Sequence, residues 1–193
     1  MNSNIKRRRR VLIGTVGYHL LRDYSIGPNL LPQLQAMDWP VGAVVDEMNW
    51  GPVAIVQQFE TLPEPYDRVI ILTATDLGKA PGIITLRLWR GGLPTVDQIQ
   101  DRVSEAVTGT ISAENLLIIG EHFDIWPEET LLVDVQPGLE EAGETFTAEI
   151  EAVVPQVLNT LQSLASVDYK QLHQLSAVEI EEIRGNELAD VRR

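Results

Sequence analysis

The sequence predicts an α/β fold in which a twisted five-stranded sheet, with one strand antiparallel, lies between two layers of helices. Short runs of β-branched and other apolar residues alternate along the chain with segments whose apolar residues recur at helical spacing. Five strands interleaved with four helices favour a three-layer sandwich, because a buried sheet must be covered on both faces. The 193 residues, 44% of them hydrophobic, suffice for one domain with a sizeable core.

The first half of the chain supplies three strands and two helices. The strands are expected over residues 11–16, 43–46 and 69–72. Each is a short apolar run, typical of a parallel strand that is buried on both faces. Helices are expected behind Gly27-Pro28 and Gly51-Pro52, because proline suits a first turn and apolar residues recur at helical spacing after each pair.

The fourth strand, over residues 83–89, is expected to run antiparallel to its neighbour in the sheet. The connection before it, which contains Lys79-Ala-Pro-Gly82, is too short to hold a helix. A parallel return would need a crossover of about a dozen residues or more, so a hairpin-like return is favoured.

The second half completes the fold with two helices, a further candidate helix and one strand. The candidate helix covers residues 97–108. The next helix runs from a cap at Ser112 to a stop near Trp126-Pro127, the strand covers residues 130–135, and the last helix covers residues 147–164. The last helix is clearly amphipathic, and Pro155 within it is expected to mark a kink or a restart.

Three regions are expected along the chain. Residues 1–9 form a basic, disordered N-terminus, and residues 10–164 form the α/β domain. Residues 165–193 form a charged appendage that could include one short helix near 176–184. The basic run Lys6 to Arg10 could dock an acidic partner, but such terminal runs are more often simply solvated.

Composition excludes several classes of protein. Fifteen Lys and Arg against 28 Asp and Glu give a net charge of −13, which disfavours nucleic-acid binding by broad charge neutralisation. The absence of cysteine excludes disulfides, thiolate zinc sites and cysteine nucleophiles. No apolar run is long enough to span a bilayer, and the basic start is not followed by a signal-peptide core, so a cytoplasmic protein is expected.

A series of short motifs resembles one family. In order, they are Val11-Leu-Ile-Gly-Thr-Val-Gly17, Leu20-Leu-Arg-Asp23, Ser25-Ile-Gly27, Val45-Asp46, Trp50-Gly51, Lys79-Ala-Pro-Gly82 and Leu131-Leu-Val-Asp-Val-Gln-Pro137. Over residues 10–164 the chain is similar to the hydrogenase maturation endopeptidases, which trim the C-terminus of a nickel–iron hydrogenase large subunit. The resemblance implies the same phosphorylase/hydrolase-like sheet between helices, with the fourth strand antiparallel.

The resemblance also implies a nickel-recognition site, and this sequence departs from it at all three ligand positions. Tyr24 stands where the family has a Glu after the Asp of the first loop, and Thr73 stands where an Asp ends the third strand. Asp76 lies three residues further on. Glu114 stands where a His opens a later helix.

These substitutions matter because a phenol, a hydroxyl and one carboxylate hold a divalent transition metal poorly near neutral pH. We therefore expect no resident metal cofactor and no catalytic residue. The residues expected to line the former cleft are Asp23, Tyr24, Asp46, Thr73, Asp76 and Glu114. In the alternative, a displaced site built on residues such as Asp76 and Glu114 would hold nickel or another divalent ion.

Two other patterns resemble sites. Gly14-Thr-Val-Gly17 follows a strand but lacks the G-x-G-x-x-G spacing of a dinucleotide-binding loop. His19, with Asp23 and Ser25, could supply a hydrolase triad, but one short loop rarely folds into such a constellation, so His19 is favoured as a surface histidine.

Three functions follow from these patterns. The first is a non-catalytic maturation or assembly factor that binds a client polypeptide resembling a hydrogenase large subunit. The second is an active metal-dependent endopeptidase with displaced ligands. The third is a binder of a small molecule at the carboxyl ends of the strands, where open α/β sheets hold ligands.

Overall fold

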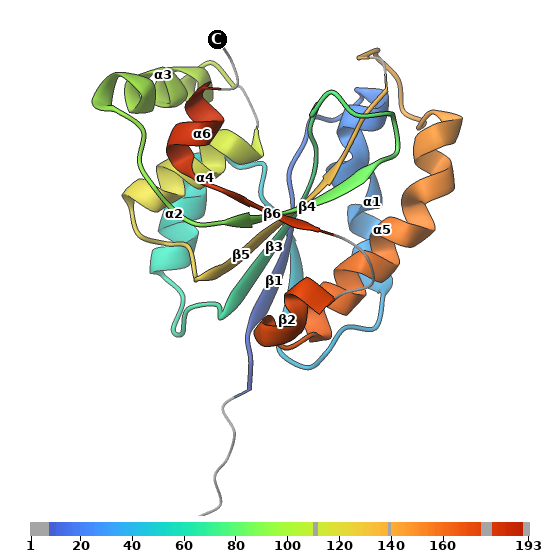
Figure 1. Cartoon of the computed structure of the whole chain (residues 1–193), viewed down its shortest axis with the longest axis horizontal. Helices are drawn as coiled ribbons and strands as arrows, with labels where there is room; N and C mark the ends of the chain where they lie inside the picture. The colour runs from blue at the N-terminus through green and yellow to red at the C-terminus, as the bar shows by residue number, and fades with distance from the viewer. Residues whose placement is uncertain (1–7, 110–111, 139, 175–178, 191–193) are drawn as a thin grey trace, which may run out of the picture.

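A computed structural model describes residues 8–109, 112–138, 140–174 and 179–190, and one sheet lies at its centre (Figure 1). The sheet has six strands in the order β2-β1-β3-β5-β4-β6. Their bounds are β1 (Val11–Thr15), β2 (Ala43–Glu47), β3 (Arg68–Ala74), β4 (Ile84–Trp89), β5 (Glu129–Val135) and β6 (Ile180–Ile183). The prediction of five strands was therefore one short, because β6 had not been expected.

Strand directions follow the expectation from sequence. β2, β1, β3 and β5 are parallel to one another, and β4 runs antiparallel to β5. The antiparallel fourth strand is confirmed. β6 pairs in parallel with β4, with Leu86 opposite Ile180 and Trp89 opposite Ile183.

Helices cover both faces of the sheet, so the three-layer arrangement is confirmed (Figure 1). On one side lie α1 (Ile26–Ala36) and α5 (Ala148–Ser166). On the other lie α2 (Pro52–Glu60), α3 (Val96–Val107), α4 (Ala113–His122) and α6 (Gly185–Asp190). Two short 3₁₀ helices, η1 (Arg22–Ser25) and η2 (Tyr169–Gln174), complete the described elements.

The core consists of two apolar clusters, one on each face of the sheet. Alternate side chains of a strand point to opposite faces, so β3 sends Ile70 and Leu72 toward α1 and α5, and Val69 and Ile71 toward α2 and α4. The near-continuous apolar sequence of β3 is the pattern of a strand that is buried on both sides.

Helix ends follow local sequence rules. Pro52 opens α2 at its first position, as expected. The Ser112 hydroxyl accepts a hydrogen bond from the Asn115 amide (3.1 Å), which caps α4. α5 runs unbroken from Ala148 to Ser166, so the restart expected at Pro155 was wrong.

The C-terminal segment is part of the sheet. Residues 180–183 form β6, so the short helix expected near 176–184 was wrong over these residues, and residues 175–178 lie outside the described part. Isoleucine side chains at both ends of β6 pack against the core, which explains why an acidic four-residue segment forms a strand.

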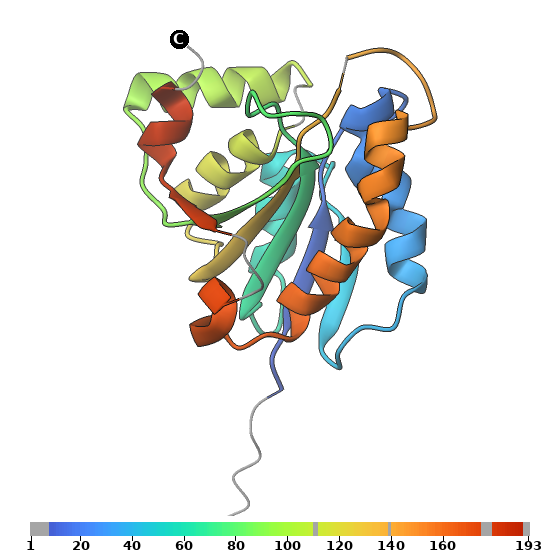
Figure 2. The same cartoon turned by 45° about the vertical axis from the view of Figure 1, so that its right-hand side comes forward.

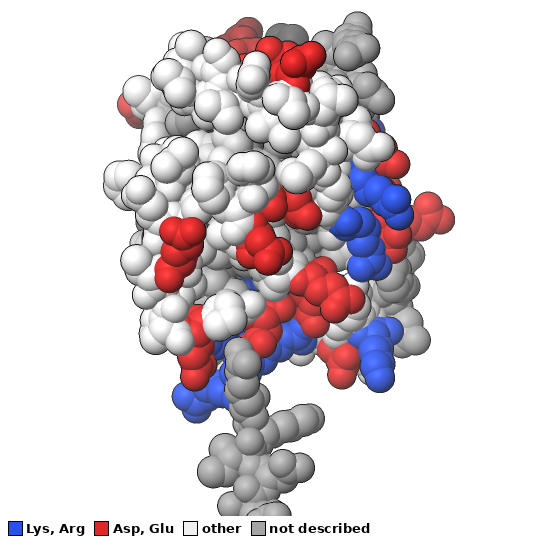
Figure 3. Space-filling model, turned by 90° about the vertical axis from the view of Figure 1, so that its left-hand side faces the viewer, with Lys and Arg blue, Asp and Glu red and all other residues white. Residues whose placement is uncertain are grey.

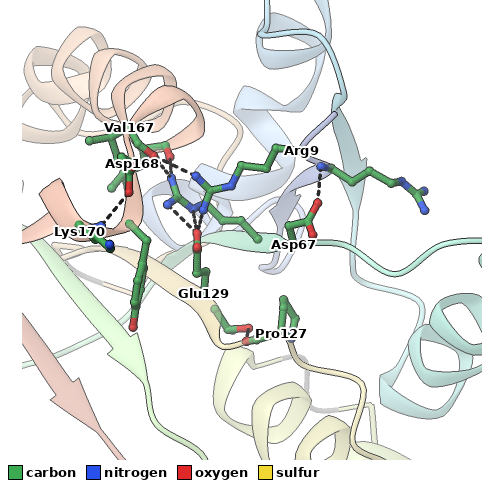
Figure 4. Close-up of polar contacts among 12 residues, drawn as sticks. Arg9, Asp67, Pro127, Glu129, Val167, Asp168 and Lys170 are labelled. Atoms are coloured by element: carbon green, nitrogen blue, oxygen red, sulfur yellow. Dashed lines mark hydrogen bonds and ion pairs between the residues drawn. The ribbon is translucent and has the colours of Figure 1, made fainter. Parts of the chain in front are cut away.

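The C-terminal end of α5 lies at the amino edge of the sheet (Figure 2), where a cluster of basic side chains holds it (Figure 4). Arg9 and Arg68 both form ion pairs with Glu129, and Arg68 is fully buried. Both guanidinium groups also donate to the Val167 carbonyl, at 3.1 Å and 3.0 Å. Burial, together with the charge of Arg9, lowers the pKa of Arg68 to about 10. Residues 1–7 of the expected disordered N-terminus lie outside the described part.

Candidate functional site

The six cleft candidates lie toward the carboxyl ends of the parallel strands and in the loops and helix that follow them. Asp23 and Tyr24 lie in η1, which follows β1, and Glu114 lies in the first turn of α4. Asp46, Thr73 and Asp76 are the others, in β2, in β3 and just beyond β3. Their surroundings divide them into separate groups rather than one constellation.

Asp23 is a structural clamp. Its buried carboxylate accepts hydrogen bonds from the Gly138 amide (3.0 Å), the Thr147 amide (2.8 Å) and the Thr147 hydroxyl (2.8 Å). These bonds tie the loop after β1 to the loop after β5 and to the residue that caps α5. Three donors occupy the carboxylate, so Asp23 organises the edge of the sheet instead of presenting a free ligand.

Tyr24 and Asp76 form a second group. The Asp76 carboxylate accepts hydrogen bonds from the Gln136 side-chain amide (2.9 Å) and the Gly78 backbone amide (2.9 Å), and both bonds lower its pKa. Burial, followed by the negative charge of Asp76, raises the pKa of the Tyr24 phenol. Tyr24 is therefore a neutral phenol at physiological pH and cannot replace a carboxylate ligand.

Thr73 and Glu114 belong to a third group, which surrounds a buried ion pair. Arg87 in β4 donates from Nε and Nη2 to the two carboxylate oxygens of Asp134 in β5, at 2.7 Å and 2.6 Å. The Thr75 hydroxyl donates to the same carboxylate at 2.6 Å. Thr73 is the register partner of Asp134 on the neighbouring strand.

Electrostatics hold this pair in its charged form. Burial by itself would lower the pKa of the Arg87 guanidinium, but the hydrogen bonds and charge of Asp134 raise it above its usual value, and Glu114 and Glu181 add to that effect. Arg87 is 4% exposed and Asp134 is fully buried. The charge of Glu114 therefore interacts with a resident cation.

Asp46 has partners of its own on β2 and α2. Its carboxylate accepts hydrogen bonds from the Glu47 amide (2.9 Å) and from the side-chain amide of Gln58 on α2 (3.0 Å). His19 Nε2 lies 3.1 Å from the Glu47 carboxylate, which also accepts a bond from Asn49 (2.8 Å). Asp46 thus connects β2 to α2, while its neighbours form a polar network at the mouth of the loop.

The structure does not assemble the triad that the first loop could have supplied. Ser25 is fully buried, and its hydroxyl accepts a hydrogen bond from the Leu21 amide (2.7 Å). His19 pairs with Glu47, while the Asp23 carboxylate is held by Gly138 and Thr147. The three side chains therefore serve separate contacts.

The residues at the implied ligand positions do not fit a divalent transition metal. Tyr24 offers a protonated phenol, Thr73 a neutral hydroxyl, and Glu114 a carboxylate that already faces Arg87. Within residues 8–109, 112–138, 140–174 and 179–190, no three carboxylate or imidazole side chains come together in a way that could hold an ion. A metal site would need at least three such donors.

A pocket of about 240 Å³ opens beside this region, where the loops after β1 and β2 meet three helices. Its lining consists of Val16, Met48, Asn49, Trp50, Gly51, Pro52, Ala106, Gly109, Ser112 and Leu116. Most of these residues are apolar. The six cleft candidates are not among them, although the segment that follows Asp46 forms one whole wall.

Sequence reasoning missed Arg87, Asp134 and the pocket. A signal for the ion pair was available, because each charged residue interrupts an apolar strand run, Leu86-Arg-Leu88 and Leu131-Leu-Val-Asp-Val135. Charges in such positions are buried and therefore need partners. The walls of the pocket come from α3 and from the segment after β2, which are far apart in sequence and gave no such signal.

Several solved structures with a similar fold are named as hydrogenase maturation peptidases. A hydrogenase 2 maturation peptidase from a Thaumarchaeota archaeon has a TM-score of 0.56 and 21% identity, over 83% of this chain and 100% of that chain. The maturating endopeptidase HybD from E. coli has a TM-score of 0.58 and 20% identity, over 79% of this chain and 89% of that chain. An endopeptidase from Escherichia coli has a TM-score of 0.60 and 19% identity, over 88% of this chain and 95% of that chain.

These matches confirm the predicted resemblance and the peptidase-like α/β fold. No protein-family model matches the sequence, and no curated protein matches it. At about one-fifth identity the likeness concerns the fold, so activity must be argued from the side chains. Among the described helices, none is both long and apolar enough to cross a membrane.

Proposed function

We propose that this protein is a non-catalytic relative of the hydrogenase maturation peptidases, and that it binds a polypeptide resembling a nickel–iron hydrogenase large subunit as a maturation or assembly factor. The solved proteins with this fold are named for hydrogenase maturation, which makes a hydrogenase-like client plausible. The client would be met in the cytoplasm, the compartment that the sequence predicts.

One observation carries the proposal. The guanidinium of Arg87 is bound by both oxygens of Asp134, and it is near enough to Glu114, at a position where the resemblance implies a metal ligand, for the Glu114 charge to raise the pKa of Arg87. A permanent cation thus interacts with Glu114, one of the carboxylates that a displaced metal site would require. A group that is positively charged at every physiological pH cannot exchange with a metal from a client.

The competing proposal, a peptidase with displaced ligands, depends mainly on Asp76 and Glu114. Asp76 accepts two hydrogen bonds and lies beside the neutral phenol of Tyr24, whereas Glu114 faces Arg87. The two carboxylates thus have different neighbours. This separation favours binding over cleavage.

The test uses a purified nickel–iron hydrogenase large subunit that carries its C-terminal extension, prepared with and without nickel. We expect stable binding in titration calorimetry with no loss of client mass after overnight incubation. Nickel, zinc and cadmium salts should give no saturable binding at micromolar concentration. Removal of a C-terminal peptide that stops in the Asp76→Ala variant would overturn the proposal.

A further inference from the structure

β6 occupies the outer edge of β4, and its four residues are in turn apolar, acidic, acidic and apolar (Figure 1). Ile180 lies opposite Leu86, and Ile183 lies opposite Trp89. Because successive side chains of a strand point to opposite faces, Ile180 packs against the core cluster of α1 and α5, and Ile183 packs against that of α2 and α4. The edge of β4 thus accommodates one apolar side chain on each face of the sheet.

Basic side chains lie along the same edge. Lys79 Nζ is 3.0 Å from the Glu181 carboxylate, and Arg90 Nη2 donates to the Glu182 carboxylate at 2.8 Å. Arg87 is the register partner of Glu181, whose charge helps to raise the pKa of Arg87. Both acidic residues of β6 therefore meet a cation that lies on or near β4.

This basic edge belongs to an acidic protein. The chain has 28 Asp and Glu against 15 Lys and Arg. Basic side chains are few on the face drawn in Figure 3, and they lie toward its right-hand and lower margins. The net charge of the molecule disfavours an acidic strand, so the local cations account for the acidic sequence that is bound here.

β6 is held by contacts that another segment could reproduce. The backbone contributes bonds such as that from the Arg90 amide to the Ile183 carbonyl (2.9 Å). The side chains of Glu181 and Glu182 are 51% and 53% exposed, and ion pairs between exposed groups add little stability. Both isoleucines are only partly buried. A short edge strand with such contacts can open while the rest of the sheet stays folded.

Buried residues anchor the chain on either side of β6. Leu172 in η2 is fully buried, and Leu188 in α6 is 3% exposed. β6 would therefore remain close to β4 after its hydrogen bonds had opened. This tethering makes β6 an intramolecular competitor for any other strand that binds at the same edge.

We propose that the outer edge of β4 is a strand-addition site for an extended acidic segment of a partner protein, and that β6 is the tethered occupant which this segment replaces. In strand addition, main-chain hydrogen bonds supply affinity and alternate side chains supply specificity. The partner segment carries two acidic residues between two apolar ones, as β6 does. The inference goes beyond the proposed function, because it does not depend on a hydrogenase-like client.

The first experiment weakens β6 in the full chain and supplies its sequence as a peptide. Acetylated Ser-Ile-Glu-Glu-Ile-Ser is titrated into the ¹⁵N-labelled parent and the double variant Ile180→Ser, Ile183→Ser. We expect the peptide to bind the variant at least tenfold more tightly than the parent and to shift the amide signals of β4. Unshifted signals of β1 and β3 report that the sheet stays folded.

Two controls accompany this titration. Val44→Ser changes a partly exposed apolar residue on β2, at the opposite edge of the sheet, and should bind the peptide within twofold of the parent. The peptide Ser-Ile-Lys-Lys-Ile-Ser should bind the double variant at least tenfold more weakly than the acidic peptide does. Equal binding of the two peptides, or no gain in affinity in the double variant, would overturn the proposal.

The second experiment reverses the charges of the edge and leaves the isoleucines of β6 in place. In Lys79→Glu, Arg90→Glu we expect the lysine peptide to bind at least tenfold more tightly than the acidic one. An unchanged preference for the acidic peptide would show that Lys79 and Arg90 do not select the segment, which contradicts the proposal. A parent dimer in sedimentation that Ile180→Ser, Ile183→Ser dissociates would also contradict it, since a second copy would then be the occupant.

Discussion

Arg87 and Asp134 form a two-pronged ion pair in the interior, with donor–acceptor distances of 2.7 Å and 2.6 Å between adjacent antiparallel strands. Asp134 is the register partner of Thr73 on β3, and the charge of Glu114 on α4 helps to raise the pKa of Arg87. Two strands and a helix therefore converge on a fixed positive charge.

Replacing Arg87 by Met should destabilise the protein by about 3 to 5 kcal/mol, because Asp134 is left buried without its cation. Urea unfolding followed by circular dichroism measures this change. The double variant Arg87→Met, Asp134→Leu should recover most of the loss. Arg90→Met, which breaks the partly exposed pair with Glu182, is the control and should cost no more than about 1 kcal/mol.

Asp23→Ala should destabilise the fold by about 2 to 3 kcal/mol, because three donors lose a charged acceptor and at least one is left without a replacement. The same unfolding measurement applies. Asp46→Ala is a suitable control, since its partners lie nearer the surface. Equal stability losses in the two variants would contradict the assignment of Asp23 as a clamp.

The pKa of Tyr24 should fall toward its ordinary value of 10 in the Asp76→Asn variant, because the Asp76 charge contributes to raising it. An absorbance titration at alkaline pH, with Tyr24→Phe as the reference, reports this directly. In the parent, the unfolded chain releases the phenolic proton at a lower pH than the folded chain does. Stability should therefore decrease as pH rises above about 10, and less so in Tyr24→Phe. An unchanged Tyr24 titration in Asp76→Asn would refute the coupling.

Glu129→Gln should destabilise the protein by about 3 kcal/mol or more, because the fully buried Arg68 loses its carboxylate and Arg9 loses the same partner. Hydrogen exchange should show earlier opening at the C-terminal end of α5, whose carbonyls Arg68 binds. Glu182→Gln removes a surface carboxylate and should leave that end of α5 protected.

The burial of Arg68 also has a pH signature of the opposite sign to that of Tyr24. Its pKa in the fold is about 10, below its usual value, so between these two values the unfolded chain holds the extra proton. The contribution of Arg68 to stability should therefore rise with pH across that interval. Comparing the alkaline unfolding curves of the parent and Arg68→Met isolates this contribution.

The fold was largely predictable because short, continuous segments of the sequence indicate most of its helices and strands. Apolar runs marked the five longer strands, and the short connection before β4 fixed its direction. β6 was missed because only its two end residues are apolar and its pairing depends on distant partners. Lys79 and Arg90, which bind Glu181 and Glu182, are about 90 to 100 residues away in sequence.

The site was less predictable, since its chemistry depends on which face each side chain occupies. The substitutions at Tyr24, Thr73 and Glu114 were visible in the sequence. The guanidinium that faces Glu114 could be recognised only once the antiparallel pairing brought Arg87 diagonally opposite Asp134. The residue type of Asp23 was compatible with a ligand role, and only its hydrogen bonds show that it does not have one.

β6 also prevents sheet-edge pairing between copies of this protein. It covers the backbone N–H and C=O groups along one side of β4, which would otherwise be open to pairing with another chain. A chain cut after Leu164 would expose that row of groups together with the apolar side chains of β4. We expect such a shortened protein to aggregate through β-sheet pairing between molecules. The C-terminal segment would therefore limit aggregation.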